Sequence, residues 1–305
     1  MRPRIHAVAS VGLALGCAAA LSACEVNLNT EGLTSKETRT FKVTGEAELT
    51  LDTFDGSIDI HSWDRDEVEV EIEKRAMEQS LIDQMTIEAD QQGNRIVVRV
   101  TGPARPERRG LTVGVYYSPA ARLRVAVPRK GSIHARTEDG TIRVEDLEGR
   151  LVFQSGDGSI TANRVSGEIE IRTADGAIRL EQAAGRLQLD TDDGSITVEG
   201  GPAVLRAKTA DGAIRVRLRG ETTMADDWDL STRDGSVTLT LPALFSAEID
   251  AETRDGSVRS SHPGLTIEPG DGERRSAPRE VRARMGDGGP VLKVRTGDGS
   301  IRFER

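Results

Sequence analysis

An evenly spaced row of aspartates is the first feature of the sequence that could do chemistry. The row consists of Asp139, Asp157, Asp175, Asp193 and Asp211, each followed by glycine and each 18 residues after the one before. Aligned carboxylates could bind calcium, whose ligands are carboxylate and carbonyl oxygens. Asp-Gly is also a favoured pair in tight turns, and the paired glycines of calcium-binding nonapeptide repeats are absent. We therefore expect corners of the fold at these positions, with no metal ion and no other cofactor.

The histidines and the remaining acids do not form a catalytic pattern. His61, His134 and His262 lie in different segments and lack the spacing of a metal site. Glycoside hydrolysis needs two carboxylates beside a sugar-binding groove, which aromatic side chains commonly line. Trp63 and Trp228 are far apart in the sequence, and neither a Gly-x-Ser-x-Gly motif nor a phosphate-binding loop is present. The sequence therefore predicts a protein without catalytic residues, with a polysaccharide-active β-helix enzyme as the alternative.

Cys24 is the residue for which the sequence predicts a covalent modification. A basic start at Arg2 and Arg4 is followed by an apolar run that ends in "LSAC", the layout of a secretory signal. Leu-Ser-Ala-Cys resembles a bacterial lipobox, after which the signal is cleaved and the cysteine receives a diacylglyceryl group. We expect residues 1–23 to be a signal peptide, Cys24 to be the lipidation site and residues 24–40 to be a polar tether. An ordinary signal peptide with an incidental cysteine is the alternative.

Short alternating segments separate the Asp-Gly pairs and must position them. The segments "EIEIRT", "AIRLEQ" and "RLQLDT" alternate apolar and polar residues, as does a strand with one buried face. In stacked units, residues 18 apart would lie above one another, for example in a ladder of Ile160, Ile178, Ile196 and Ile214. The predicted fold class is therefore all-β, as an elongated, β-helix-like β-solenoid of 18-residue, two-strand repeats.

An antiparallel meander or sandwich is the alternative architecture. Asp-Gly suits a two-residue hairpin turn, and pairing across Asp157-Gly158 would place Phe153 opposite Ala162 on one apolar face. The constant repeat length favours the solenoid, because stacked units must match in length whereas hairpins vary. In either fold, we expect Gly176 and Gly194 to hold the positive φ of a tight corner.

The repeats also resemble a known family of bacterial domains. "DTFDGSIDIHSWDRDEVEVEIEKRA", the "TxDGxI" ladder and the terminal "VLKVRTGDGSIRFER" are similar to the "putative adhesin" domains of unknown function, which have β-strand repeats and occur on envelope proteins. The resemblance covers about Phe41 to Arg305. It implies a β-helix or related repeat sheet at the cell envelope, and it implies no particular activity.

The repeat pattern is not uniform along the chain. Residues 41–128 form an irregular N-terminal β region, with a short helix or loop before Met85, and residues 129–305 form the Asp-Gly repeats. The stretch from Ser260 to Pro290 is rich in Gly, Pro and charge, which predicts a long surface loop. Charges in the last strand, Ser300 to Arg305, would discourage growth at a sheet edge. We therefore expect a charged edge strand there and a monomeric protein.

The net charge of the chain limits the kinds of partner that it can bind. The chain has a formal net charge of -9, with acids and bases interleaved, which argues against nucleic acid. Outward positions of the predicted strands form a ribbon of mixed charge that could dock an extended polymer or a protein. These positions are Glu170, Arg172, Arg179, Glu181, Asp190, Glu199, Arg206, Lys208, Arg215 and Arg217. The sequence thus predicts a lipid-anchored protein of the bacterial cell envelope, facing periplasm or exterior, that binds or scaffolds an envelope protein or glycan; a sensory component of an envelope-stress system is a further alternative.

Overall fold

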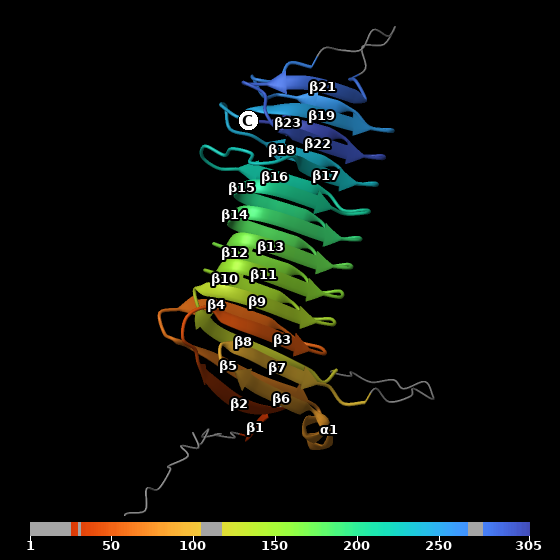
Figure 1. The fold of residues 1–305 in the computed structure, drawn as a ribbon. Coiled ribbons are helices and arrows are strands. Elements are labelled where there is room, and N and C mark those ends of the chain that lie inside the picture. Colours follow the sequence, from red (N-terminus) through yellow and green to blue (C-terminus); the bar gives the residue numbers. More distant parts are fainter. Residues whose placement is uncertain (1–25, 30–31, 105–117, 268–276) are drawn as a thin grey trace, which may run out of the picture.

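The strands are arranged as a tall stack with the chain running across it from one rung to the next (Figure 1). The computed structural model describes residues 26–29, 32–104, 118–267 and 277–305, which contain 23 strands and one short helix, α1 (Gln79–Gln84). All of these strands belong to one hydrogen-bonded sheet. The prediction of an all-β fold is confirmed.

The middle of the stack consists of parallel strands offset by one repeat. Its elements are β9 (Lys130–Thr137), β10 (Ile142–Glu145), β11 (Glu148–Ser155), β12 (Ile160–Asn163), β13 (Ser166–Thr173), β14 (Ile178–Thr191), β15 (Ile196–Lys208) and β16 (Ile214–Leu218). Ile160 is in register with Ile178, and Phe153 with Ile171, each pair in parallel strands 18 residues apart. The hairpin pairing of Phe153 with Ala162 is therefore not formed.

Each repeat contributes one rung, which has a strand on each of two faces. We call the strands that precede an Asp-Gly corner the front face and those that follow it the back face. Thus β9, β11 and β13 are on the front face, β10, β12 and β16 are on the back face, and β14 and β15 each run from the back face around the second corner to the front face.

Apolar side chains from the two faces meet in one continuous core. The predicted ladder of Ile160, Ile178, Ile196 and Ile214 is buried, with each residue at most 1% exposed. Leu151, Ile169, Leu187 and Leu205 form a second buried ladder on the front face. Outward positions of the same strands alternate with these residues, so the repeat sequence fixes which side chains reach solvent.

At the N-terminal end the order of rungs in space differs from their order in the chain. The first rung, β3 (Ala47–Thr53) and β4 (Ile58–Trp63), lies between a second rung and the middle of the stack. Leu51 of β3 is in register with both Val98 of β7 (Arg95–Thr101) and Ala135 of β9. Likewise, β4 lies between β8 (Ala120–Pro128) and β10.

Antiparallel strands complete this end of the stack. They are β1 (Val26–Asn29), β2 (Gly32–Lys42), β5 (Glu67–Ala76) and β6 (Thr86–Gln92). β5 pairs with β8 and β2, and β6 pairs with β7. Part of the segment predicted as a tether, residues 24–40, belongs to β2. This strand pairs with β5 from Leu33 to Lys42.

The C-terminal end has the same kind of rearrangement. Its strands are β17 (Trp228–Thr232), β18 (Val237–Thr240), β19 (Ala247–Thr253), β20 (Val258–Ser260), β21 (Glu280–Met285), β22 (Val291–Thr296) and β23 (Ile301–Glu304). Val294 of β22 is in register with Leu230 of β17 and Ala251 of β19. Phe303 of β23 is in register with Leu239 of β18 and Ser260 of β20.

Two predictions for this end are therefore wrong. The last strand of the chain is not at an edge, because β23 has hydrogen-bonded neighbours on both sides. The stretch predicted as a long loop contains β21, which pairs antiparallel with β19 and so forms its neighbour in the sheet. Residues 268–276 of that stretch lie outside the described residues.

Candidate functional site

The predicted lipidation site, Cys24, lies outside the described residues, and so does the whole predicted signal peptide. The predicted aspartate row, the histidines and the charged ribbon all fall within them.

The Asp-Gly corners are aligned along the stack, and their carboxylates are exposed to solvent. Asp139, Asp157, Asp175, Asp193 and Asp211 are all exposed. Where these corners form ion pairs, the partner is an arginine: Arg233 lies 3.3 Å from Asp211, and Arg254 lies 2.5 Å from Asp298. Among the described residues, no three His, Cys, Asp or Glu side chains are placed to hold one metal ion.

A threonine or serine hydroxyl connects most of the Asp-Gly corners to a neighbouring rung. Thr173 Oγ1 donates to the carbonyl oxygen of Gly158 at 3.0 Å and accepts a hydrogen bond from the Gly176 amide at 3.3 Å. The same donation to a glycine carbonyl is made by Thr137, Thr191, Thr209, Thr232, Thr253 and Thr296, and by Ser155. The Thr-x-Asp-Gly spacing thus satisfies buried polar groups between rungs.

Gly176 and Gly194 are needed at their corners for close approach and not for positive φ. Gly176 and Gly194 are absent from the positive-φ glycines, so the conformation predicted for them is wrong. A Cβ on Gly176 would lie 2.1 Å from the carbonyl oxygen of Gly158, and one on Gly194 would lie 1.9 Å from that of Gly176. The next rung leaves no room for a side chain at this position.

The three described histidines serve the fold or face solvent. His61 and His134 are exposed on different rungs. His262 is buried, and its Nδ1 accepts a hydrogen bond from the Gly264 amide at 3.0 Å while Nε2 lies 3.0 Å from the Pro242 carbonyl oxygen. A neutral ring that donates through Nε2 satisfies both contacts. His262 therefore holds two loops together, a role that its isolated position in the sequence did not indicate.

The predicted charged ribbon is divided between the two faces. Glu170, Arg172, Asp190, Arg206 and Lys208 are on the front face, and Glu181, Glu199, Arg179, Arg215 and Arg217 are on the back face. Strand alternation was predicted correctly, but the corner within each of β14 and β15 carries successive charges to opposite sides of the molecule.

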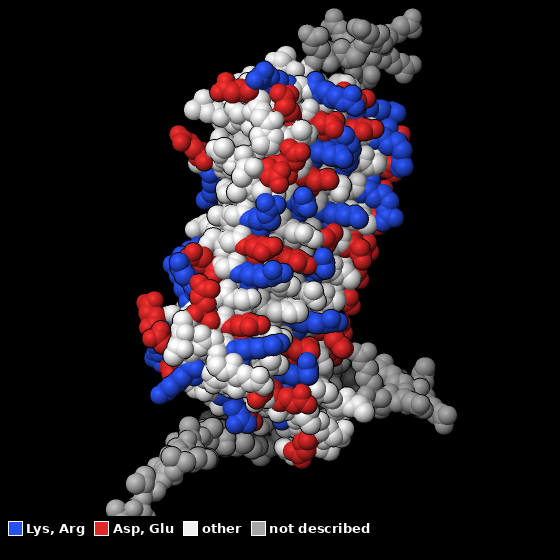
Figure 2. Space-filling view, viewed as in Figure 1, with Lys and Arg blue, Asp and Glu red and all other residues white. Residues whose placement is uncertain are grey.

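On the front face, acidic and basic side chains alternate along the stack (Figure 2). At the N-terminal end, Arg99 of β7 lies 3.2 Å from Asp52 of β3 and 3.4 Å from Glu88 of β6. At the C-terminal end, Arg295 of β22 lies 2.5 Å from Asp250 and 3.3 Å from Glu252, both of β19. Neighbouring rungs at both ends are thus held by cross-strand ion pairs.

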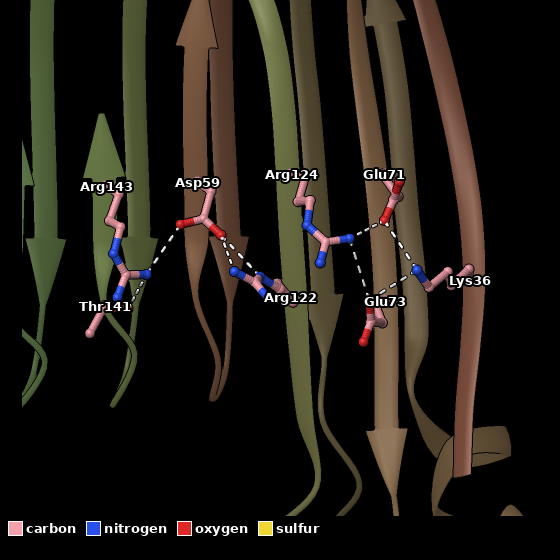
Figure 3. A network of polar contacts seen from close by, with 8 residues as sticks. All are labelled: Lys36, Asp59, Glu71, Glu73, Arg122, Arg124, Thr141 and Arg143. Atoms are coloured by element: carbon pink, nitrogen blue, oxygen red, sulfur yellow. Dashed lines mark hydrogen bonds and ion pairs between the residues drawn. The ribbon is translucent and has the colours of Figure 1, made fainter. Parts of the chain in front are cut away.

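On the back face, a polar network joins the antiparallel strands to the parallel stack (Figure 3). Lys36 of β2 lies 3.4 Å from Glu73 of β5, and Arg124 of β8 pairs with Glu73 and Glu71. On the other side, Asp59 of β4 accepts hydrogen bonds from Arg122 at 3.0 Å and from Arg143 at 3.2 Å. The arginines at this end of the face are therefore neutralised by neighbouring acids.

Two aspartates are held in their charged form by arginine. The hydrogen bond from Arg295 lowers the pKa of Asp250 below its usual value, although partial burial opposes this. Hydrogen bonds from Arg164 at 2.6 and 2.7 Å likewise lower the pKa of Asp146. Both pairs connect adjacent strands or corners, so their chemistry is that of structural ion pairs.

The fold and these faces define a class of protein: an all-β repeat protein whose parallel rungs expose two charged faces. A family model, Toastrack DUF4097, matches residues 30–303. The chain belongs to this family, and the resemblance to domains of the "putative adhesin" type is confirmed.

Three solved structures are similar over most of their length. A "putative adhesin" from Parabacteroides merdae has 11% identity and a TM-score of 0.45, covering 88% of this chain and 96% of its own. A "putative adhesin" from Parabacteroides distasonis has 13% identity and a TM-score of 0.44, covering 88% and 96%. A "putative lipid binding protein" from the same organism has 13% identity and a TM-score of 0.38, covering 88% and 97%. No curated protein matches the chain. Within the described residues, no helix has the length and hydropathy needed to cross a membrane.

Proposed function

We propose that this chain is a lipid-anchored protein of the bacterial cell envelope that binds or scaffolds other envelope components and does not catalyse a reaction. In this proposal residues 1–23 are a signal peptide, Cys24 carries the lipid, and the parallel rungs are turns of an elongated β-solenoid whose exposed faces are the working surface. The Toastrack family membership supports an envelope location through the envelope proteins on which such domains occur.

The observation that carries the proposal is the pair of regular, charged faces on one stack. Repeated rungs place like positions in straight rows, and such extended surfaces suit partners that make many weak contacts. Many of the described acids are engaged in structural pairs, such as Asp250 with Arg295, or stand at exposed corners. This arrangement favours a binding role over hydrolysis, which needs two carboxylates facing one groove.

The lipid anchor is tested by mass spectrometry of membrane and soluble fractions from cells that express the wild-type chain or Cys24→Ala. We expect the wild-type protein in the membrane fraction with an N-terminal diacylglyceryl cysteine, since added acyl chains drive membrane binding. The variant should lose the modification and leave that fraction. Wild-type protein in the soluble fraction with an unmodified Cys24 would contradict the anchor.

The binding role is tested in the same cells by crosslinking from the exposed faces. Single cysteines placed at front-face Gln188 and back-face Thr197 would carry the crosslinker. We expect a defined partner or glycan adduct from one face in preference to the other. Equal, diffuse labelling from both faces would contradict a specific binding surface.

A further inference from the structure

One column of outward residues on the back face alternates arginine and threonine over seven successive strands. Its members are Arg143, Thr161, Arg179, Thr197, Arg215, Thr238 and Arg302, and it ends at Arg259 on β20. Each is in register with the next, so the side chains stand in a row along the stack. We call this row the arginine column.

The arginine column changes character along its length. Arg143, at its N-terminal end, is paired with Asp59 at 3.2 Å (Figure 3). Arg179, Arg215, Arg302 and Arg259 are exposed and make no ion pair with any described residue. Most front-face arginines near the two ends of the stack are paired with acids on neighbouring strands. By contrast, these four guanidinium groups of the arginine column are cations that remain available to a ligand.

The surroundings of the available arginines are also basic. The back face around these four arginines also carries two further basic residues, Arg217 and Arg219. The acidic residues on the same surface are Glu181, Glu199 and Glu304. Glu199 is itself held by Arg217 at 3.1 Å and Arg219 at 2.6 Å. The acids that make the whole chain negative are largely on the front face and the corners. Exposed charges farther apart than a Debye length, about 8 Å at physiological salt, are largely screened, so the local sign decides what approaches this face.

The spacing indicates a polymer with regularly repeated charge. Strands are about 4.8 Å apart, so arginines on alternate strands stand about 9.6 Å apart. A sugar unit in an extended polysaccharide advances by a length similar to one strand spacing. A glycan with one carboxylate on every second sugar therefore places a carboxylate at each arginine. The intervening Thr161, Thr197 and Thr238 offer hydroxyl groups to the sugars between, and guanidinium groups bind carboxylates with paired hydrogen bonds.

We propose that the C-terminal half of the back face binds a linear acidic polysaccharide along the arginine column. The proposal rests on the binding role proposed above and names its partner by chemistry. Single-stranded nucleic acid is disfavoured, because β14, β15, β16, β18, β20 and β23 project no aromatic side chain from this face on which bases could stack.

The test uses the full chain, purified in detergent, and immobilised hyaluronan oligosaccharides, which carry one carboxylate on every second sugar. We expect binding at low salt that weakens as salt is added, and no binding to uncharged dextran. The triple variant Arg179→Gln, Arg215→Gln, Arg302→Gln should lose on the order of tenfold in affinity or more, because three charge-assisted contacts are removed.

A matched triple variant separates the column from net charge. Arg99→Gln, Arg150→Gln and Arg172→Gln remove the same charge from the front face, where all three arginines are in ion pairs. This control should bind hyaluronan as the wild type does. Equal losses in both triples, or no binding of the wild type at low salt, would overturn the proposal, and so would single-stranded DNA bound as tightly as hyaluronan. This assay uses purified components, so its result is independent of the lipid-modification and crosslinking experiments in cells. Failure of the polysaccharide proposal can therefore be distinguished from failure of the proposed function.

Discussion

The corner residues Thr-x-Asp-Gly connect neighbouring rungs by hydrogen bonds and close packing. The threonine hydroxyl of one rung donates to a glycine carbonyl of the next, and the glycine has no side chain because that carbonyl oxygen occupies its place. The aspartate between them points to solvent. The threonine and the glycine of the motif are therefore required for contact between rungs, whereas the aspartate favours the turn.

Substitution of a corner glycine tests this division. Gly176→Ala should lower the free energy of unfolding by roughly 1–3 kcal/mol, because its Cβ would overlap a backbone oxygen that cannot rotate away. Urea unfolding followed by circular dichroism measures the change. The neighbouring Asp175→Asn should change it by less than about 0.5 kcal/mol. Equal tolerance of both substitutions would refute close packing at the corner.

The pair of Asp250 and Arg295 predicts a pH dependence of stability. Since the pKa of Asp250 is lowered in the folded state, its contribution is complete above the unfolded value, near 3.8, and is lost as the pH falls through the folded value. Asp250→Asn should therefore be less stable than the wild type at about pH 6, by about 1 kcal/mol, and this deficit should shrink below about pH 4.

The matched control for this prediction is Asp229→Asn, on the neighbouring strand β17. Asp229 is in register with Lys293, but no ion pair joins the two. Thermal unfolding of both variants at the two pH values makes the comparison. A deficit of Asp250→Asn that stays constant with pH would show that the ion pair is not its source.

At the scale of the residue, the sequence allowed correct prediction of the buried ladders and of the Asp-Gly corners. It did not reveal why the glycines are needed, because close approach between rungs depends on residues 18 positions away. It also did not reveal the arginine column. That signal is present in the sequence as the residue after each corner Ile or Val, but it becomes a row only when the register of the strands is known.

At the scale of the element, the order of rungs follows charge complementarity. The strand β22 presents Lys293 and Arg295, and it lies between β17 with Asp229 and β19 with Glu248, Asp250 and Glu252. Direct pairing of β17 with β19 would bring these acids together, and like charges on adjacent strands are destabilising. At the N-terminal end the acidic β3 lies between the basic β7 and β9 in the same way.

This order could not be predicted from hydrophobic pattern. Every rung has the same alternation, so any rung could stack on any other with its apolar residues inside. The sequence-based expectation that neighbours in the chain are neighbours in space holds from β9 to β18 and fails at both ends, where front-face charges distinguish one rung from another.

Hydrogen exchange tests the internal position of the last rung. Phe303 is fully buried, and Phe303→Ala should cost roughly 3–5 kcal/mol locally. We expect faster amide exchange in both β18 and β20, which precede β23 by 40 residues or more in the sequence but flank it in space, and unchanged exchange in β12. Phe153→Ala is the control, and it should affect β9 and β13 instead. Faster exchange on only one side of β23 would contradict its insertion between two strands.

At the scale of the whole molecule, the two faces have different tasks. Cross-strand ion pairs at both ends of the front face and at the N-terminal end of the back face neutralise their charges and hold the rungs in register. The C-terminal half of the back face keeps unpaired cations, and it lies at the end of the stack farther from the N-terminal strands (Figure 1). If the lipid is attached at Cys24, this surface stands away from the membrane.

The inserted last rung also has a consequence for biosynthesis. A chain leaves the ribosome from its N-terminus, and its domains begin to fold as they emerge. The rung formed by β19 and β20 emerges before β22 and β23, yet it joins the stack only through them. The partners that connect this rung to the stack are thus made after it. Completion of the distal end therefore waits for the synthesis of β22 and β23, and a chain that stops before them cannot close this part of its stack.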